Sequence, residues 1–356
     1  MEDDRISNLP DDLLCHILSF LRTKQSVATS ILSCKWKSLW RSVPTLDLNY
    51  GPSNYTKEGY DHFIQTVVAV IQTLDLHQPI KKFRLRFTSY DDESTNINAW
   101  VNSVVQRGVQ HIDLSICFLQ YLEQRPSTNL SAIFTCSTLV VLKLEWLELT
   151  ELKPFSSINL PLLKVLHLDL VAFSELQCLT QLLSGCPVLE EFIARCPIFY
   201  NDTTGSNREL KTLPKLVKAD ISTRFSLMEA VKNVEFLRIY EMQRLRRHDD
   251  GEGAGPYGFP KFHNLTHIEL EYNCRISDWL TVVELLKHCP KLQVLVINQS
   301  CLPDDFGEVV EDWEYPPSVP ESIQLCLKCT SKEKNLVLNF KLIELVIYLW
   351  LVVNLI

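Results

Sequence analysis

Residues 160–170 read LPLLKVLHLDL, and residues 186–196, twenty-six positions later, read CPVLEEFIARC. In the first stretch the apolar side chains of Leu163, Leu166 and Leu168 are separated by three positions and then by two. The second stretch has the same spacing. A spacing of two is the period of a β-strand with one buried face, so the last two leucines predict a short strand. Two stretches with one pattern predict a repeated structural unit.

The pattern occurs nine times along the chain, which indicates an array of repeats. Successive units begin 18 to 31 residues apart, and most spacings are in or near the range of about 20–29 residues that leucine-rich repeats have. Between the strands, residues 95–107 and 174–184 carry apolar side chains at helical spacing, and Gly185 ends the second helix. Alternating strands and helices predict an α/β leucine-rich-repeat solenoid with a parallel sheet on its concave face. The nine units begin at Ile80, Val109, Leu139, Leu163, Leu189, Leu216, Val234, Leu265 and Leu292.

Three cysteines occupy one recurring position in the repeats, where we expect them to pack and not to bind a ligand. Cys136, Cys186 and Cys289 each lie three residues before the first apolar residue of a unit, where other units have Leu, Val or Phe. A position that accepts those residues is a core position. The N-terminus is acidic and has no apolar leader segment, so we expect all twelve cysteines to be free thiols in the cytoplasm or nucleus.

The residues between the strand leucines are expected to face outward on the concave side. We expect this face to bind a partner protein, which we call the target. They form a mixed surface of cationic, acidic and aromatic side chains, which starts with Lys82, Arg84, His111 and Asp113. The alternative is a solvated sheet face, with binding elsewhere on the loops. The residues that we select for target binding are Lys143, His167, Lys218, Asp220, Phe236, Arg238, His267 and Glu269.

The first fifty residues have a helical pattern instead. Pro10 followed by two aspartates is typical of a helix start, and apolar residues recur at helical spacing from residue 13 to residue 21. Thr23 starts a second predicted helix, and a third places Trp36 and Trp40 on one face. Three short helices bury little surface by themselves, so the leucines and tryptophans indicate a partner protein. An ordinary helical end on a larger fold is the alternative.

Residues 4–48 resemble a plant F-box along almost their whole length. The matching features are Leu-Pro-Asp before the first helix, the LLxxILSFL face and the closing LSxxWxxLW, while Cys34 and Lys35 stand where the family often has Lys-Arg. The resemblance implies that this module binds a Skp-type adaptor, and through it a cullin, in an SCF-type ubiquitin ligase. It does not separate residues that face the adaptor from residues of the module's own core. The residues that it implies for the module and this contact are Leu9, Pro10, Leu13, Leu14, Ile17, Leu18, Leu32, Trp36, Leu39 and Trp40.

Residues 313–321, WEYPPSVPE, resemble the opening of the FBD region that follows leucine-rich repeats in many plant F-box proteins. Ser322 stands where that family usually has Cys, and the resemblance fades after it. The tail over residues 342–356 is strongly apolar, but it is shorter than the roughly 20 residues of a membrane span and contains Glu344 and Asn354. We interpret it as a strand or helix at the end of the solenoid, or as the product of an altered reading frame; a membrane anchor is the alternative.

The sequence contains no convincing motif for catalysis or for binding a cofactor or a metal ion. The glycines at 251, 253 and 255 lie among acidic residues that would repel a phosphate, so we expect a loop there. Cys326 and Cys329 have the spacing of half a zinc site without a second pair nearby, so no metal is predicted. The net charge of −8 disfavours non-specific binding to nucleic acid. We therefore expect no cofactor, no nucleic-acid partner and no enzymatic activity.

These patterns predict four regions and one function. We expect an F-box module over residues 1–50, a helical linker or cap of the solenoid over 51–79, the repeats over 80–305 and a partial or altered FBD-like region over 306–356. The favoured interpretation is a non-catalytic substrate receptor of an SCF-type ubiquitin ligase, which holds an unknown target protein. The alternatives are a repeat scaffold without ligase function, a truncated family member and a membrane-tethered binder.

Overall fold

The computed structural model divides the chain into two compact units. The first comprises residues 1–189 and 196–204, and the second comprises residues 190–195 and 205–356. The residues that the structure describes are 6–50, 56–74, 78–89, 97–118, 130–149, 158–199, 212–222, 225–240, 259–272, 282, 285–299 and 328–330.

The first unit begins with a small helical module. Pro10 precedes its first helix, and Asp11 and Asp12 lie in the first turn, where carboxylates interact favourably with the helix dipole. The predicted three-helix pattern is confirmed, with two short 3₁₀ turns in addition. The elements are α1 (Asp11–Leu18), α2 (Thr23–Ala28), η1 (Thr29–Ile31), α3 (Trp36–Leu39) and η2 (Trp40–Ser42).

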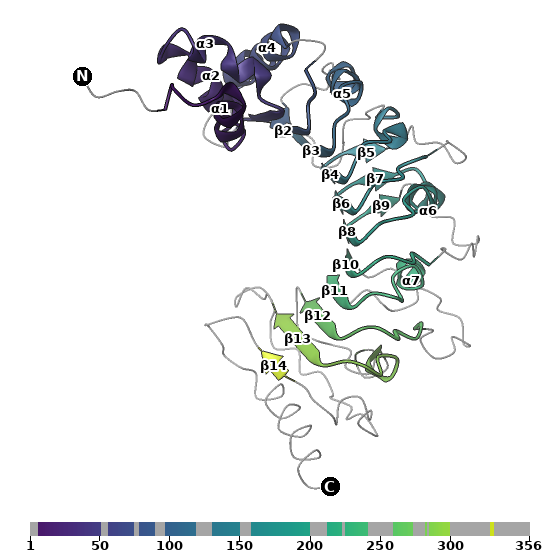
Figure 1. Cartoon of the computed structure of the whole chain (residues 1–356). Helices are drawn as coiled ribbons and strands as arrows, with labels where there is room; N and C mark the ends of the chain where they lie inside the picture. Colours follow the sequence, from purple (N-terminus) through teal and green to yellow (C-terminus); the bar gives the residue numbers. More distant parts are fainter. Residues whose placement is uncertain are drawn as a thin grey trace, which may run out of the picture. The chain divides into compact units, whose positions relative to one another are not determined.

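A parallel sheet follows the module in the first unit. Its strands lie side by side in the order β1 (Thr45–Asn49), β2 (Lys82–Ser89), β3 (His111–Phe118), β4 (Val141–Glu145) and β6 (Val165–Asp169) (Figure 1). The segments between strands contain α4 (Lys57–Thr73), α5 (Ile97–Val105) and η4 (Ile133–Thr135), and α6 (Leu176–Ser184) follows β6. Strand and helix therefore alternate as the sequence predicts.

The strand register places the repeat leucines of the first unit in rows. Leu85 is paired with Leu114, Leu114 with Leu144, and Leu144 with Leu168. All four side chains are at most 1% exposed. Each fully buried leucine stabilises the fold by about 1.5–3 kcal/mol, so the rows form the core of this unit. The alternate strand residues lie on the opposite face of the sheet, which we call the helix-free face.

The second unit continues the same pattern of parallel strands. Its sheet has the order β8, β10, β11, β12, β13 and β14, and α7 (Phe225–Met228) lies between β10 and β11. Each of the nine predicted units contains a strand that starts two residues after its first apolar residue, which confirms the repeat pattern. The bounds are β8 (Glu191–Arg195), β10 (Lys218–Ser222), β11 (Phe236–Tyr240), β12 (His267–Tyr272), β13 (Val294–Gln299) and β14 (Lys328–Thr330).

The recurring cysteines are core residues, as predicted. Cys136, Cys186 and Cys289 are 5%, 1% and 0% exposed. The thiol of Cys186 donates to the carbonyl of Leu182 over 3.1 Å, and burial raises its pKa to about 12. Burial likewise raises the pKa of the Cys289 thiol to about 12. Both thiols are therefore protonated and inert at neutral pH.

Gly185 follows the last residue of α6, also as predicted, but for another physical reason than a left-handed turn. Its φ is −78°, a value that any residue adopts. A Cβ atom at this position would instead collide with the side chain and carbonyl of Ile158. The glycine is needed because two chain segments approach each other closely here.

A second, smaller sheet was not predicted from the sequence. It consists of β5 (Glu148–Leu149), β7 (Ala172–Phe173) and β9 (Ile198–Phe199), paired in parallel in the first unit. In each case the chain turns into the short strand through a residue with positive φ, at Trp146, Leu170 and Cys196. Strands of two residues have no detectable periodicity, and none of the three turn residues is a glycine.

Strand β1 was likewise not expected as a member of the sheet. Leu46 and Leu48 pair in register with Phe83 and Leu85 of β2, so the sheet starts before the first predicted repeat.

Several other expectations lie outside the described residues: the FBD-like segment, the apolar tail, the glycine-rich loop and the Cys326 half of the zinc motif. Among the described helices, none is long and apolar enough to cross a membrane.

Candidate functional site

The structure separates the predicted module residues into two groups. Leu14, Leu18, Trp36 and Leu39 form one core cluster with Val43, and each is at most 5% exposed. Leu9 packs against the cluster and is half-buried, as is Trp40. The core cluster and Leu9 hold the module together.

The other predicted residues point into solvent. Leu13 is 50% exposed, Ile17 45% and Leu32 64%, and Pro10 is exposed as well. Exposed apolar side chains gather in this module: six of the nine large ones among the described residues precede residue 33. A concentration of this kind makes the module a candidate protein interaction site. The six, which we call the apolar helical face, are Ile6, Leu13, Ile17, Phe20, Ile31 and Leu32.

Sequence analysis missed Ile6, Phe20 and Ile31 as members of this face. The signal for Phe20 was present, because it follows Ile17 by three positions and Leu13 by seven, which is one helical stripe. Ile31 lies in a 3₁₀ turn, for which helical periodicity gives no guidance.

Polar contacts fasten the N-terminal segment onto α3. The ammonium of Lys35 donates to the carbonyls of Ser7 and Leu9 over 2.8 and 2.7 Å, and it lies 3.2 Å from the carboxylate of Asp11. The indole Nε1 of Trp36 donates to the Ser7 hydroxyl over 2.9 Å. These bonds hold the residues before α1 beside the apolar helical face.

The module is joined to the sheet without a free linker. The hydroxyl of Thr23, at the start of α2, accepts the backbone N–H of Asp47 in β1 over 2.8 Å. The carbonyl of Pro44 accepts the backbone N–H groups of Lys81 and Lys82 over 2.8 and 3.1 Å. The module therefore has a defined orientation relative to the first strands of its own unit.

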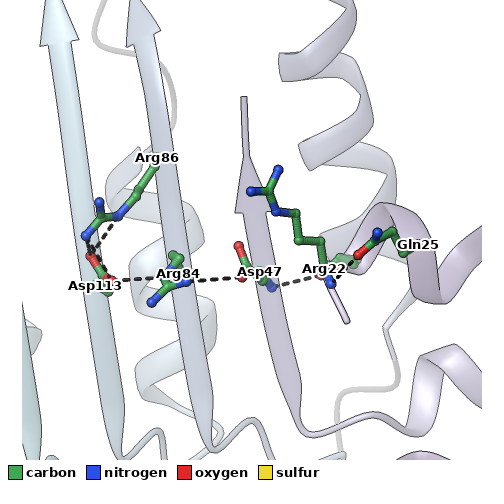
Figure 2. A network of polar contacts seen from close by, with 7 residues as sticks. Arg22, Gln25, Asp47, Arg84, Arg86 and Asp113 are labelled. Carbon is green, nitrogen blue, oxygen red and sulfur yellow. Dashed lines mark hydrogen bonds and ion pairs between the residues drawn. The ribbon is translucent and has the colours of Figure 1, made fainter. Parts of the chain in front are cut away.

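Charged residues on the helix-free face of the first unit are joined in a ladder (Figure 2). Arg84 of β2 lies between Asp47 of β1, at 3.3 Å, and Asp113 of β3, at 2.9 Å. Asp113 also accepts three bonds of 2.9–3.2 Å from Arg86. Arg86 extends the ladder to Glu145 of β4 at 3.8 Å. Both oxygens of Asp113 are thus occupied by guanidinium groups.

The second unit carries its own ion pairs on the equivalent face. Arg195 binds the carboxylate of Asp220, which is 4% exposed, and Arg238 lies 2.6 Å from Glu271 and 3.7 Å from Glu269. Lys218 lies 3.7 Å from Glu191, and its ammonium is 5.6 Å from the ring centre of Phe236. Such pairs neutralise most of the charge that the sequence places on this face.

The eight residues selected for target binding are distributed over both units. Lys143 and His167 are paired neighbours on the helix-free face of the first unit. The other six lie in the second unit, where Asp220, Arg238 and Glu269 already have intramolecular partners. Sequence analysis could not find those partners, because each pair joins residues on different strands.

A metal centre is not visible in the described part of the chain, which holds no group of three His, Cys, Asp or Glu residues able to bind an ion. Eight of the cysteines within the described residues are free thiols. The two surfaces described above, the apolar helical face and the charged sheet face, are therefore the candidate functional sites.

Comparison with known proteins matches the helical module and part of the repeats to two sequence profiles. The sequence profile of the F-box domain matches residues 6–47, which contain the helical module. A profile for the leucine-rich repeats of the FBD-associated F-box protein At5g56370 matches residues 97–213. The FBD-associated F-box protein At5g38590 of Arabidopsis thaliana is 30% identical over 369 residues, covering 90% of this chain and 84% of that protein. The chain belongs to the plant F-box/LRR-repeat family.

Two further Arabidopsis thaliana members show how the similarity is distributed. The F-box/LRR-repeat protein At4g14103 is 30% identical over 360 residues, which cover 83% of this chain and 91% of the relative. The F-box/FBD/LRR-repeat protein At2g26030 is 35% identical over 204 residues, covering 56% of this chain and 43% of the relative. The apolar helical face is thus a surface of the F-box domain, and the charged ladder starts where that domain joins the repeats.

Proposed function

We propose that this protein is a non-catalytic substrate-recognition subunit of an SCF-type ubiquitin ligase. Its F-box binds a Skp-type adaptor through the apolar helical face, and the adaptor links it to a cullin. The helix-free face of the repeats binds the target protein. In this role the protein raises the effective concentration of the target near the ubiquitin-transfer machinery and performs no bond chemistry itself.

The observation that carries the proposal is the separation of two apolar sets within one small domain. Leu14 and Leu18 close the core of the F-box, so the exposure of Leu13, at 50%, and Ile17, at 45%, is not needed for folding. Exposed apolar side chains at helical spacing are how a helix presents itself to a partner protein. The F-box supports a location in the cytoplasm or the nucleus for the proposed activity.

The test is co-purification with a Skp-type adaptor. A Leu13→Asp, Ile17→Asp double variant should lose capture while its thermal unfolding stays close to that of the wild type, because both side chains are exposed. Leu162→Asp is the matched control, since Leu162 is 53% exposed but lies outside the F-box. Capture by this control should be unchanged.

Substitutions at Leu14 or Trp36 do not distinguish loss of the adaptor contact from loss of the fold. Both residues belong to the F-box core, so replacing them would abolish capture by unfolding the module. If a folded wild-type protein fails to capture the adaptor, the ligase role is wrong. The chain would then be a repeat scaffold without ligase function.

A further inference from the structure

Three residues on the helix-free face of the first unit stand apart from the charged ladder. Lys82 and His111 are the first residues of β2 and β3 and are paired across the two strands. Lys143 lies on the next strand, β4, paired with Asp113. The side chains of Lys82 and His111 are exposed, and that of Lys143 is half-buried. We call these three residues the Lys82 cluster.

The two ammonium groups have no acidic partner in the described part of the chain. Asp113 is the neighbour that Lys143 would pair with across the strands, but Arg84 and Arg86 occupy both of its carboxylate oxygens. Glu145, the next acid along β4, lies 3.8 Å from Arg86. The carboxylates nearest to Lys143 are thus engaged by arginines, and the two ammonium groups of the Lys82 cluster form no ion pair among the described residues.

The positive charge of the two lysines also affects the pKa of His111. Partial burial lowers the pKa of His111 from 6.5, and the positive charges of Lys82 and Lys143 lower it further. The histidine is therefore neutral at pH 7 and able to donate one hydrogen bond. It lies on β3, the strand between those of the two lysines. A surface of this composition, within a chain of net charge −8, is a local site for anions.

We propose that the Lys82 cluster binds an acidic, extended segment of a protein partner, with carboxylates on Lys82 and Lys143. Adjacent strands lie about 4.8 Å apart and residues rise about 3.3 Å along a strand, which places the two lysine Cα atoms on the order of 12 Å apart. About four residues of extended chain span this distance. Acidic residues at alternate positions of the segment therefore match the cluster.

The identity of the segment as part of a ligase target rests on the proposed function, but the binding itself does not require the adaptor. The probe is a fluorescent octapeptide of alternating Glu and Gly, compared at low salt with its Gln and Gly counterpart by fluorescence anisotropy. The wild-type protein should bind the Glu peptide about tenfold more tightly than the Gln peptide. Raising the salt should remove the difference, because exposed charges are screened.

A Lys82→Gln, Lys143→Gln double variant should weaken binding of the Glu peptide about tenfold, the sum of two exposed charge pairs. The matched control is Lys57→Gln, an exposed lysine at the start of α4, which should leave binding unchanged. Equal affinity for the two peptides, or unchanged affinity in the double variant, would overturn the proposal. Adaptor capture by the same variants shows separately whether the F-box function holds.

A second measurement uses the wild-type protein alone and so does not depend on how the variants fold. A carbodiimide joins a carboxylate to a lysine amine that touches it as an amide, and the carbodiimide takes up the water and becomes a urea. Peptide mapping should locate the Glu peptide on Lys82 or Lys143. Attachment to other lysines without either of these would contradict the proposal.

Discussion

Leu13 and Leu14 are neighbours in one helix, yet the side chain of Leu13 is 50% exposed and that of Leu14 is fully buried. Leu14→Ala should lower the free energy of unfolding by about 2–5 kcal/mol, because it leaves a cavity in the F-box core. Leu13→Ala should lower it by less than about 1 kcal/mol. Urea unfolding followed by tryptophan fluorescence would measure both. Equal losses would show that Leu13 also belongs to the core.

The ionisation of His111 is a second consequence at the residue scale. Lys82→Gln or Lys143→Gln should raise the pKa of His111 toward 6.5, because each substitution removes a repelling positive charge. In the wild type the unfolded chain takes up this proton at a higher pH than the folded chain. His111 therefore lowers stability as the pH falls below about 6.5.

An NMR titration would measure the pKa, with the signal assigned through a His111→Gln variant. A titration midpoint of His111 that is the same in the wild type and in both lysine variants would show that burial alone lowers its pKa.

At the scale of the structural elements, the turn into each short strand of the second sheet is strained. Leu170 has a φ of 52°, which is costly for any residue other than glycine and most costly for a β-branched one. Leu170→Ile keeps the volume and hydrophobicity of the side chain and should destabilise the protein by about 1–2 kcal/mol. Leu162→Ile, at an exposed position without positive φ, should cost little. Chemical unfolding of both variants would decide.

The hydrogen bond between α2 and β1 is the second feature at this scale. Thr23→Val keeps the shape of a buried side chain but removes the acceptor of the Asp47 N–H group. A loss of about 1–3 kcal/mol is expected, since an unsatisfied donor is left behind. Hydrogen exchange at the Asp47 amide should become faster. Thr45→Val, a half-buried threonine in β1, is the control and should change neither quantity much.

Elements with a clear period were predictable from the sequence, and those without one were not. The strand leucines and the helical stretches between them follow from spacing alone, as Leu166 and Leu168 show. Strand β1 was missed because its two leucines close the F-box motif and belong to no repeat spacing. The sequence did not divide the implied module residues into core and exposed ones, since Leu13 and Leu14 differ only in helical orientation, and their contact with an adaptor stays a prediction. The ladder was missed because Arg84 meets Asp113 only through the strand register.

For the whole molecule, the direct connection between the F-box and the sheet should matter for ubiquitin transfer if the proposed function holds. A six-residue Gly-Ser insertion between Val43 and Pro44 should leave adaptor capture intact, because the F-box has its own core. Transfer to a bound target should fall, since a flexible linker no longer holds the repeats at a set distance from the adaptor. The same segment appended after Ile356 is the control. A reconstituted ubiquitination assay would show unchanged transfer if orientation is unimportant.

The F-box also protects the end of the repeat array. Strand β1 is the first strand of its sheet, and α2 lies against its outer side, where the Thr23 hydroxyl takes up the Asp47 N–H. A bare outer strand would offer unpaired N–H and C=O groups to the sheet of another molecule and promote aggregation. Repeat arrays generally require a terminal unit that prevents this. The repeats of this protein are therefore expected to remain monomeric only while the F-box is attached, so loss of the F-box would remove solubility together with the proposed ligase function.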